Sequence, residues 1–140
     1  MKDLFNEINI KRCISPVSEA GNTALVGQII DKQGFESLTY AIATGSLADA
    51  DATFTVLLEE GAASNLSDAV AVADADLLGT EVLASFLFSD DDKCFKLGYI
   101  GGKRYTRLTI TPAANASAAL ITAIAILGNP HIAPTANPPV

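Results

Sequence analysis

The residue types that catalyse reactions are scarce in this chain. Its 140 residues include one histidine, His131, which lies in the proline-rich segment NPHIAPTANPPV. A nucleophile needs a base within hydrogen-bond distance, and an imidazole in a mobile arm is not held there, so we expect His131 to be an exposed contact residue. Carboxylates are plentiful, but they cluster in loops without an aromatic-rich cleft, which disfavours glycoside hydrolysis. We expect that the chain is not an enzyme.

Two short motifs resemble binding loops and fail at essential positions. The run LGYIGGKR has the glycines of a phosphate loop, but Leu97 stands at the first glycine and Arg104 replaces the Ser or Thr. The run from Asp74 to Gly79 resembles the start of a calcium loop. There Leu78 occupies the fifth position, and Ser85 stands where a bidentate Glu is required. The sequence therefore predicts no cofactor and no metal site.

The two cysteines indicate the compartment rather than a site. Cys13 and Cys94 are far apart in the sequence, with no C-x-x-C motif and no nearby histidine. We therefore expect two free thiols in a protein made in a reducing compartment. Residues 1–12 lack the apolar stretch of a signal peptide, and the most apolar run, residues 118–127, is shorter than the ~20 residues that span a bilayer. A soluble protein without membrane contact is expected.

The segment of residues 93–111, KCFKLGYIGGKRYTRLTIT, carries the strongest local signal. Two runs of strand-forming residues flank Gly101 and Gly102, and a two-glycine loop is typical of a β-hairpin. In this hairpin Lys96 lies opposite Arg107, an unfavourable pair of like charges that an anionic partner is expected to neutralise. The exposed face of the predicted hairpin carries Lys96, Lys103, Tyr105 and Arg107.

Charge is distributed unevenly along the chain. The formal net charge is -7, which disfavours direct nucleic-acid binding, because such proteins usually carry a basic surface. Residues 33–92 hold twelve acidic side chains and no Lys or Arg, whereas residues 93–140 hold five Lys or Arg and no Asp or Glu. The two segments either neutralise each other within the fold, which we favour, or they dock copies or partners from opposite edges.

Apolar residues make up 49% of the chain, and the mean hydropathy is +0.33. An alanine-rich core explains this composition, and so does an apolar surface that is buried against another chain. The final strand expected over residues 118–127 is apolar on both faces, as in a strand covered from both sides. One cover is the core, and the other is a loop, the N-terminal arm or a second subunit.

Alternation of apolar and polar residues predicts further strands over residues 22–30, 35–43, 53–58 and 82–88. Residues 61–80 are expected to hold a short strand and then one helical turn at Asp74 to Leu78. In total we predict an all-β, jelly-roll-like β-sandwich of about eight short strands. It comprises residues 22–128, between an extended N-terminal arm (1–21) and a proline-rich C-terminal arm (129–140).

Four blocks of the sequence resemble the capsid cement (decoration) proteins that tailed phages, short-tailed ones among them, encode beside their head genes. The blocks are LTYAIATGSLADADATFTVLLEEG, VADADLLGTE, KLGYIGGKRYTRLTITP and AIAILGNPHIAP. The resemblance covers most of residues 22–134 and is most specific over 97–112. It implies a jelly-roll homodimer on the outside of an HK97-like icosahedral shell, where it cements neighbouring subunits of the major capsid protein. It also implies assembly in the bacterial host cytoplasm and no catalytic residues.

Two hypotheses for the function follow. The first is a structural virion protein on the capsid exterior. The alternative is a β-sandwich that binds a ligand such as a carbohydrate, although such modules usually present aromatic platforms and this chain has three Tyr, six Phe and no Trp. The residues that we expect at the protein interface are Lys96, Lys103, Tyr105, Arg107, Ile121, Ala123, Ala125, Leu127, Pro130, His131 and Pro134.

Overall fold

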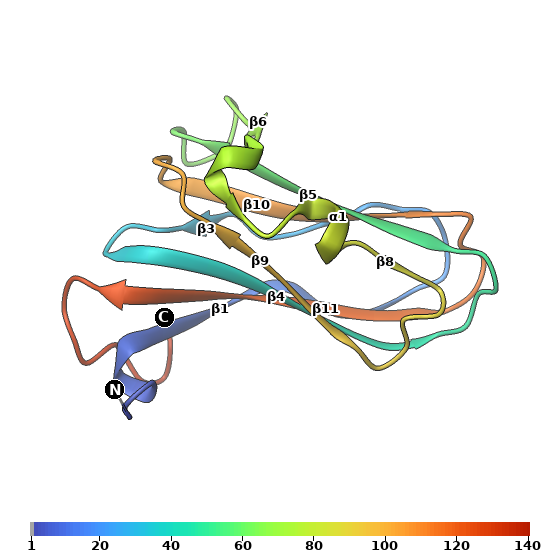
Figure 1. Cartoon of the computed structure of the whole chain (residues 1–140), viewed down its shortest axis with the longest axis horizontal. Coiled ribbons are helices and arrows are strands. Elements are labelled where there is room, and N and C mark those ends of the chain that lie inside the picture. Colours follow the sequence, from blue (N-terminus) through green and yellow to red (C-terminus); the bar gives the residue numbers. More distant parts are fainter. Residues whose placement is uncertain (1) are drawn as a thin grey trace.

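Strands with alternating apolar residues build two antiparallel sheets that pack face to face (Figure 1). The structure, a computed structural model, describes residues 2–140. Sheet A has the order β1 (Ile8–Glu19), β11 (Ala119–Pro130), β4 (Phe35–Leu47), β9 (Cys94–Tyr99) and β7 (Leu77–Leu78). Sheet B has the order β2 (Leu25–Val26), β10 (Tyr105–Ala113), β5 (Thr53–Gly61) and β6 (Val70–Ala71), with β3 (Ile30–Asp31) on β10 and β8 (Phe86–Leu87) on β5. The predicted all-β, jelly-roll-like sandwich is confirmed.

Three short helical segments lie between the strands: η1 (Phe5–Glu7), η2 (Asp74–Asp76) and α1 (Glu81–Ala84). The strand and helical turn predicted within residues 61–80 correspond to β6 and η2. The strand predicted over residues 82–88 is wrong in its first half, where α1 forms instead. Thr80 starts this helix, because its hydroxyl accepts a hydrogen bond from the Leu83 amide at 3.1 Å. No helix among residues 2–140 has the length and apolar character needed to span a membrane.

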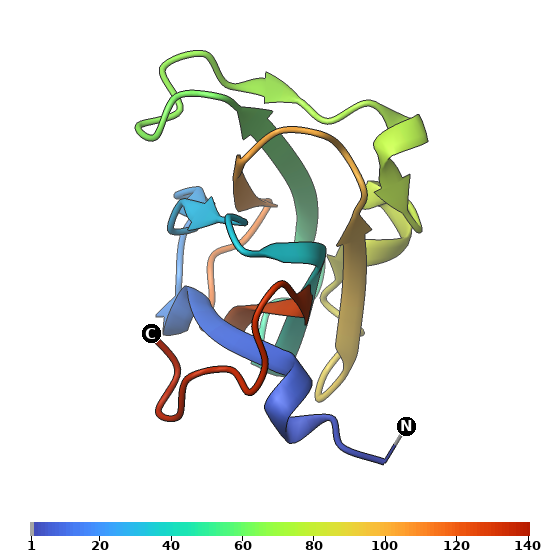
Figure 2. The ribbon, with the colours of Figure 1, turned by 90° about the vertical axis from the view of Figure 1, so that its left-hand side faces the viewer.

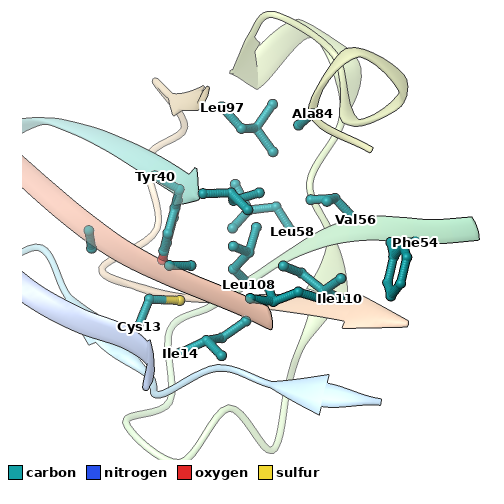
Figure 3. Packing of buried hydrophobic residues seen from close by; sticks show 14 of the residues in the cluster. Cys13, Ile14, Tyr40, Phe54, Val56, Leu58, Ala84, Leu97, Leu108 and Ile110 are labelled. Atoms are coloured by element: carbon teal, nitrogen blue, oxygen red, sulfur yellow. The ribbon is translucent and has the colours of Figure 1, made fainter. Parts of the chain in front are cut away.

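The core lies between the sheets, and alternation predicted its strands well. In β4 and β5 the inward positions are buried, while their neighbours are partly or fully exposed. The close view in Figure 3 shows side chains from both sheets interdigitating. The hydroxyls of Tyr40 on β4 and Thr106 on β10 lie 2.6 Å apart and join the sheets through the core, which satisfies two buried polar groups. The inward residues of β4 and β5 are Leu38, Tyr40, Ile42, Phe54, Val56 and Leu58.

The predicted hairpin at Gly101-Gly102 is wrong, because β9 and β10 belong to different sheets. β9 pairs with β4 and β7, whereas β10 pairs with β5, β2 and β3. Lys96 therefore lies opposite Ala41, and Arg107 lies opposite Glu59. The chain crosses between the sheets over the ring of Tyr99, where a Cβ on Gly101 would lie 2.6 Å from that ring. Gly101 is thus required for close approach to Tyr99 rather than for a tight turn.

The N-terminal segment is part of the sandwich rather than a separate arm. β1 pairs with β11 over most of its length, interrupted by register shifts near Ile14 and Val17. It forms one edge of sheet A, and Gln28 closes part of that edge by donating its amide N–H to the Cys13 carbonyl at 2.9 Å. A boundary at residue 21 therefore does not separate an arm from the sandwich.

The C-terminal tail, residues 131–140, folds back beside the start of β1 instead of extending away from the sandwich (Figure 2). Thr135 donates its amide N–H to the Asn6 carbonyl at 3.0 Å and its hydroxyl to the Ile8 carbonyl at 2.6 Å. The His131 amide donates to the Gly34 carbonyl at 2.9 Å. These contacts bring the two ends of the described chain to the same end of the molecule.

Candidate docking surface

The outward face of sheet A carries several aliphatic side chains, with polar groups such as Thr39 and Thr122 between them. We define the sheet-A face as the outward side chains at the middle of the sheet, where register places Ile126 between Ile10 and Thr39, and Ile124 between Arg12 and Ala41. Ile10 and Leu120 are 42% and 45% exposed. The sheet-A face consists of Ile10, Thr39, Ala41, Ala43, Lys96, Leu120, Ile124 and Ile126. Exposed aliphatic side chains that adjoin over several strands are typical of an interaction surface.

Helix α1 presents two more aliphatic side chains next to this sheet. Val82 is 82% exposed and Leu83 is 73% exposed, although the helix itself is firmly held. Glu81 accepts the Leu58 amide N–H at 2.7 Å, and the Ser85 hydroxyl accepts the Val56 amide N–H at 2.9 Å. Because residues 81 and 85 bind β5 through one side of the helix, residues 82 and 83 point away from it. We call Val82, Leu83 and the adjacent Leu78 of β7 the α1 ridge.

Two hollows flank the sheet-A face. One lies between the α1 ridge and β9 and is lined by Leu78, Leu83, Cys94 and Lys96, among others. Gly98 forms part of its floor, because Leu78 packs 2.8 Å from the position of a Cβ on that glycine. The second hollow lies near the β1 bulge and is lined mainly by apolar groups. The sheet-A face therefore has a hollow on each side.

Cations border this face without carboxylate partners. Lys96 lies on the sheet-A face, and Arg12 on β1 donates to Ser15 at 2.9 Å and to Gln28 at 2.7 Å, both of them neutral acceptors. Among residues 2–140, neither cation forms an ion pair. The surface thus combines an apolar middle with positive charge, and a complementary partner is apolar with acidic groups at its rim.

The outward face of sheet B combines threonines and a charged pair with two exposed aliphatic side chains, Val26 at 60% and Leu57 at 37%, on either side of Thr109. Thr53, Thr55, Thr109 and Thr111 point outward from β5 and β10. Arg107 faces Glu59 across the two strands, and the nitrogen-to-oxygen distance is 2.8 Å. The predicted unmatched charge at Arg107 is therefore absent, because the chain supplies its own carboxylate. The acidic middle and basic end of the sequence neutralise each other at this position, as we favoured from sequence.

The aromatic side chains divide between the core and the surface, where Phe5 is 68% and Phe88 is 37% exposed. Tyr40, Tyr99, Phe54 and Phe86 belong to the core. Tyr99 donates a short hydrogen bond from its hydroxyl to the buried carboxylate of Glu60, and burial together with this bond raises the pKa of Tyr99. The sheet-A face and the α1 ridge carry no aromatic residue. Neither offers the planar platform on which a sugar ring stacks.

The structure separates the predicted interface residues into five places. Lys96 is on the sheet-A face, and Lys103 is exposed in the β9–β10 connection. Tyr105 and Arg107 lie on β10 in the other sheet. Pro130 is the last residue of β11, and His131 and Pro134 lie in the C-terminal tail. The remaining four, Ile121, Ala123, Ala125 and Leu127, are at most 2% exposed and face the core, so in the folded chain they are not available to a partner.

The choice of these four residues was wrong because β11 is apolar on both faces. Leu120, Ile124 and Ile126 point outward, whereas Ile121 and Leu127 point inward together with three alanines. The small inward alanines fit because large residues such as Tyr40 and Leu108 already occupy the space between the sheets. The available signal was that the alanines of the central part of β11 lie on one face of the strand. The α1 ridge was missed because residues 82–88 were interpreted as a strand.

No family model matches the chain, and neither does any curated protein sequence. Among solved structures, a xylan-binding module, CBM15, is similar, with a TM-score of 0.52, 12% identity and coverage of 93% of this chain and 95% of that one. The CBM22-1–GH10 part of xylanase 10B from Clostridium thermocellum gives a TM-score of 0.46 at 12% identity; the match covers 95% of this chain but only 28% of that chain. YomS, an SPBc2 prophage-derived protein, gives 0.42 at 12% identity, over 84% and 94%. At these identities, the likeness to CBM15 shows the fold alone.

Proposed function

We propose that this chain is a capsid cement protein that docks on the major capsid protein of an HK97-like phage shell. The observation that carries the proposal is the apolar surface formed by the sheet-A face and the α1 ridge. Val82 and Leu83 stay exposed on a helix that three side-chain hydrogen bonds hold in place. Aliphatic side chains fixed in water are favourable only when another surface covers them. The resemblance of the sequence to cement proteins supplies the identity of the partner.

The chemistry of the surface suits a structural clamp. Its contacts are spread over five strands rather than concentrated in a cleft, so binding energy comes from area and shape. Lys96 and Arg12 orient the chain toward an acidic rim on the partner. Many copies on one shell multiply a modest affinity, because each copy joins subunits that are already close together. A homodimer formed through part of the same surface belongs to this proposal.

The fold likeness favours a second candidate function, carbohydrate binding. Most of the similar solved structures are carbohydrate-binding modules or enzymes that contain them, and the match with the xylan-binding module spans nearly the whole of both chains. This comparison favours the second candidate more than the first. The absence of an aromatic platform on the sheet-A face and the α1 ridge favours protein docking instead.

A pair of matched variants tests the docking surface. Ile124→Glu places a charge at the middle of the sheet-A face, and Thr111→Glu places one on the outward face of sheet B. Both positions point outward from long strands, so both variants should fold. Light scattering after size exclusion measures the oligomeric state, and co-sedimentation with shells of the encoding phage measures binding.

We expect Ile124→Glu to weaken binding at least about 30-fold, since a charge at the centre of an interface removes more than about 2 kcal/mol. Thr111→Glu should bind as the wild type does. Equal binding by both variants would exclude the sheet-A face as the docking surface. A wild-type chain that ignores shells but is retained on a xylan or glucan column would support the second candidate.

A further inference from the structure

A third hollow lies beneath the C-terminal tail, away from the sheet-A face. It has a volume of about 530 Å³. Residue Asn9 of β1, the turn before β4 and the tail surround it. We call it the tail hollow, and its lining includes Asn9, Gln33, Phe35, His131, Ile132 and Val140. A short hydrogen bond between His131 and Glu36 fastens one side of the tail to the start of β4.

The side chain of Asn9 is the unusual feature of this hollow. Asn9 is only 5% exposed, and its Nδ2 donates to the Val140 carbonyl at 3.2 Å. Its Oδ1 is buried and accepts no hydrogen bond from residues 2–140. A buried carbonyl oxygen without a donor costs free energy, so such an atom beside a hollow points to a missing partner that carries an O–H or N–H group.

The remaining lining indicates the chemistry of that partner. No Asp, Glu, Lys or Arg side chain lines the tail hollow, so its lining offers mainly hydrogen-bonding and apolar groups. The amide of Gln33 and the imidazole of His131 can donate and accept hydrogen bonds. Phe35 and the 82%-exposed Ile132 add apolar area. A neutral ring with hydroxyls along its edge and C–H groups on its face would match both the hydrogen-bonding side chains and the apolar area of this lining.

We infer that the tail hollow binds a neutral pyranose sugar, with a sugar hydroxyl donating to Asn9 Oδ1. The inference rests on the second candidate function, and it assigns the site to the tail end instead of a sheet face. Entry of the sugar requires a shift of the tail around Val140, because Asn9 Oδ1 is covered in the closed arrangement. The hydrogen bonds of Thr135 and His131 hold the rest of the tail in place.

The test is a nuclear magnetic resonance titration of the full chain with D-xylose, D-glucose and D-galactose at millimolar concentrations. We expect shifts of the Asn9 side-chain amide, the Gly34 backbone amide and the Ile132 methyl groups for at least one sugar. Asn9→Ala should weaken this binding at least tenfold. Gln33→Ala, at an exposed position, should weaken it without affecting folding.

Asn115 provides a matched control at another place in the fold. It is 2% exposed, its Oδ1 also lacks a donor, and it lines none of the hollows described above. Asn115→Ala should leave sugar binding unchanged, as should Ile124→Glu on the sheet-A face. Equal weakening by Asn9→Ala and Asn115→Ala would overturn the inference, and so would the absence of shifts with all three sugars. Shifts centred on the sheet-A face would overturn this site while leaving carbohydrate binding as the function.

Discussion

The outward faces of the two sheets differ in how their charges are paired, although both are built from strands with period-two alternation. Sheet B combines threonines with the exposed Val26 and Leu57, and it pairs Arg107 with Glu59 within the chain. Sheet A exposes isoleucine, leucine and alanine, and Lys96 and Arg12 at its face lack carboxylate partners among residues 2–140. A sandwich needs only one apolar face per sheet to fold. The outward aliphatic side chains of sheet A are therefore not needed for the core, and they belong to the surface that we propose for docking.

The largest expected effect is a difference in the free energy of unfolding between substitutions on the inner and the outer face of β11. Leu127→Ala should lower the free energy of unfolding by roughly 2–5 kcal/mol, because Leu127 is fully buried and its removal leaves a cavity. Leu120→Ala, at an outward position of the same strand, should change it by less than about 1 kcal/mol. Urea denaturation of both variants measures the difference. Similar losses for the two would show that the assignment of the faces is incorrect.

A smaller effect tests whether sheet B neutralises its own charges. Arg107→Glu places a carboxylate opposite Glu59 in the ladder and should reduce stability by about 1 kcal/mol, without weakening docking. Arg107→Met is the matched control, because it removes the cation but adds no repulsion. Loss of shell binding by Arg107→Glu at unchanged stability would move the docking surface to sheet B.

The pH dependence of stability gives a third test at the sheet-B side. The Arg104 guanidinium, whose Nε lies 2.8 Å from Asp31, holds the pKa of Asp31 below its usual value. The pair therefore stabilises the fold above the unfolded-state pKa of Asp31, about 4, and this contribution disappears as pH falls through the lower folded-state pKa. Arg104→Gln should lower the melting temperature slightly at neutral pH and not at all in strong acid. A difference that is constant with pH would assign the effect to packing.

The reactivity of the two cysteine thiols distinguishes the core from the sheet-A side of the molecule, and measuring it does not require unfolding the protein. Burial raises the pKa of the Cys13 thiol to about 12, whereas Cys94 is exposed beside the sheet-A face. In the native protein one thiol should react with a disulfide reagent, and Cys94→Ser should abolish this reaction. Docking on a shell should slow the labelling of Cys94. Unchanged labelling in the docked state would exclude β9 from the interface.

Local pattern was enough to predict the fold class and much of the core. Alternation predicted a strand over residues 35–43, and its alternate residues Leu38, Tyr40 and Ile42 lie in the core. The same method failed at Val82. It predicted a strand there, because the apolar residues of a helix of only four residues give the same pattern as the start of a strand. It also failed at Asn9, because a lone asparagine gives no sign that its oxygen is buried without a donor.

The order of residues by itself determined which positions alternate, where turns interrupt them and that little helix forms. These features follow from short-range geometry. Tertiary structure alone decided which strands pair and which face of β11 is turned toward the core. Tyr99 inserts its ring into the core, so the chain crosses to the other sheet at Gly101 instead of turning back. In β11 both faces are apolar, and only packing against the opposite sheet selects the face that carries Ala123 and Ala125 for the interior.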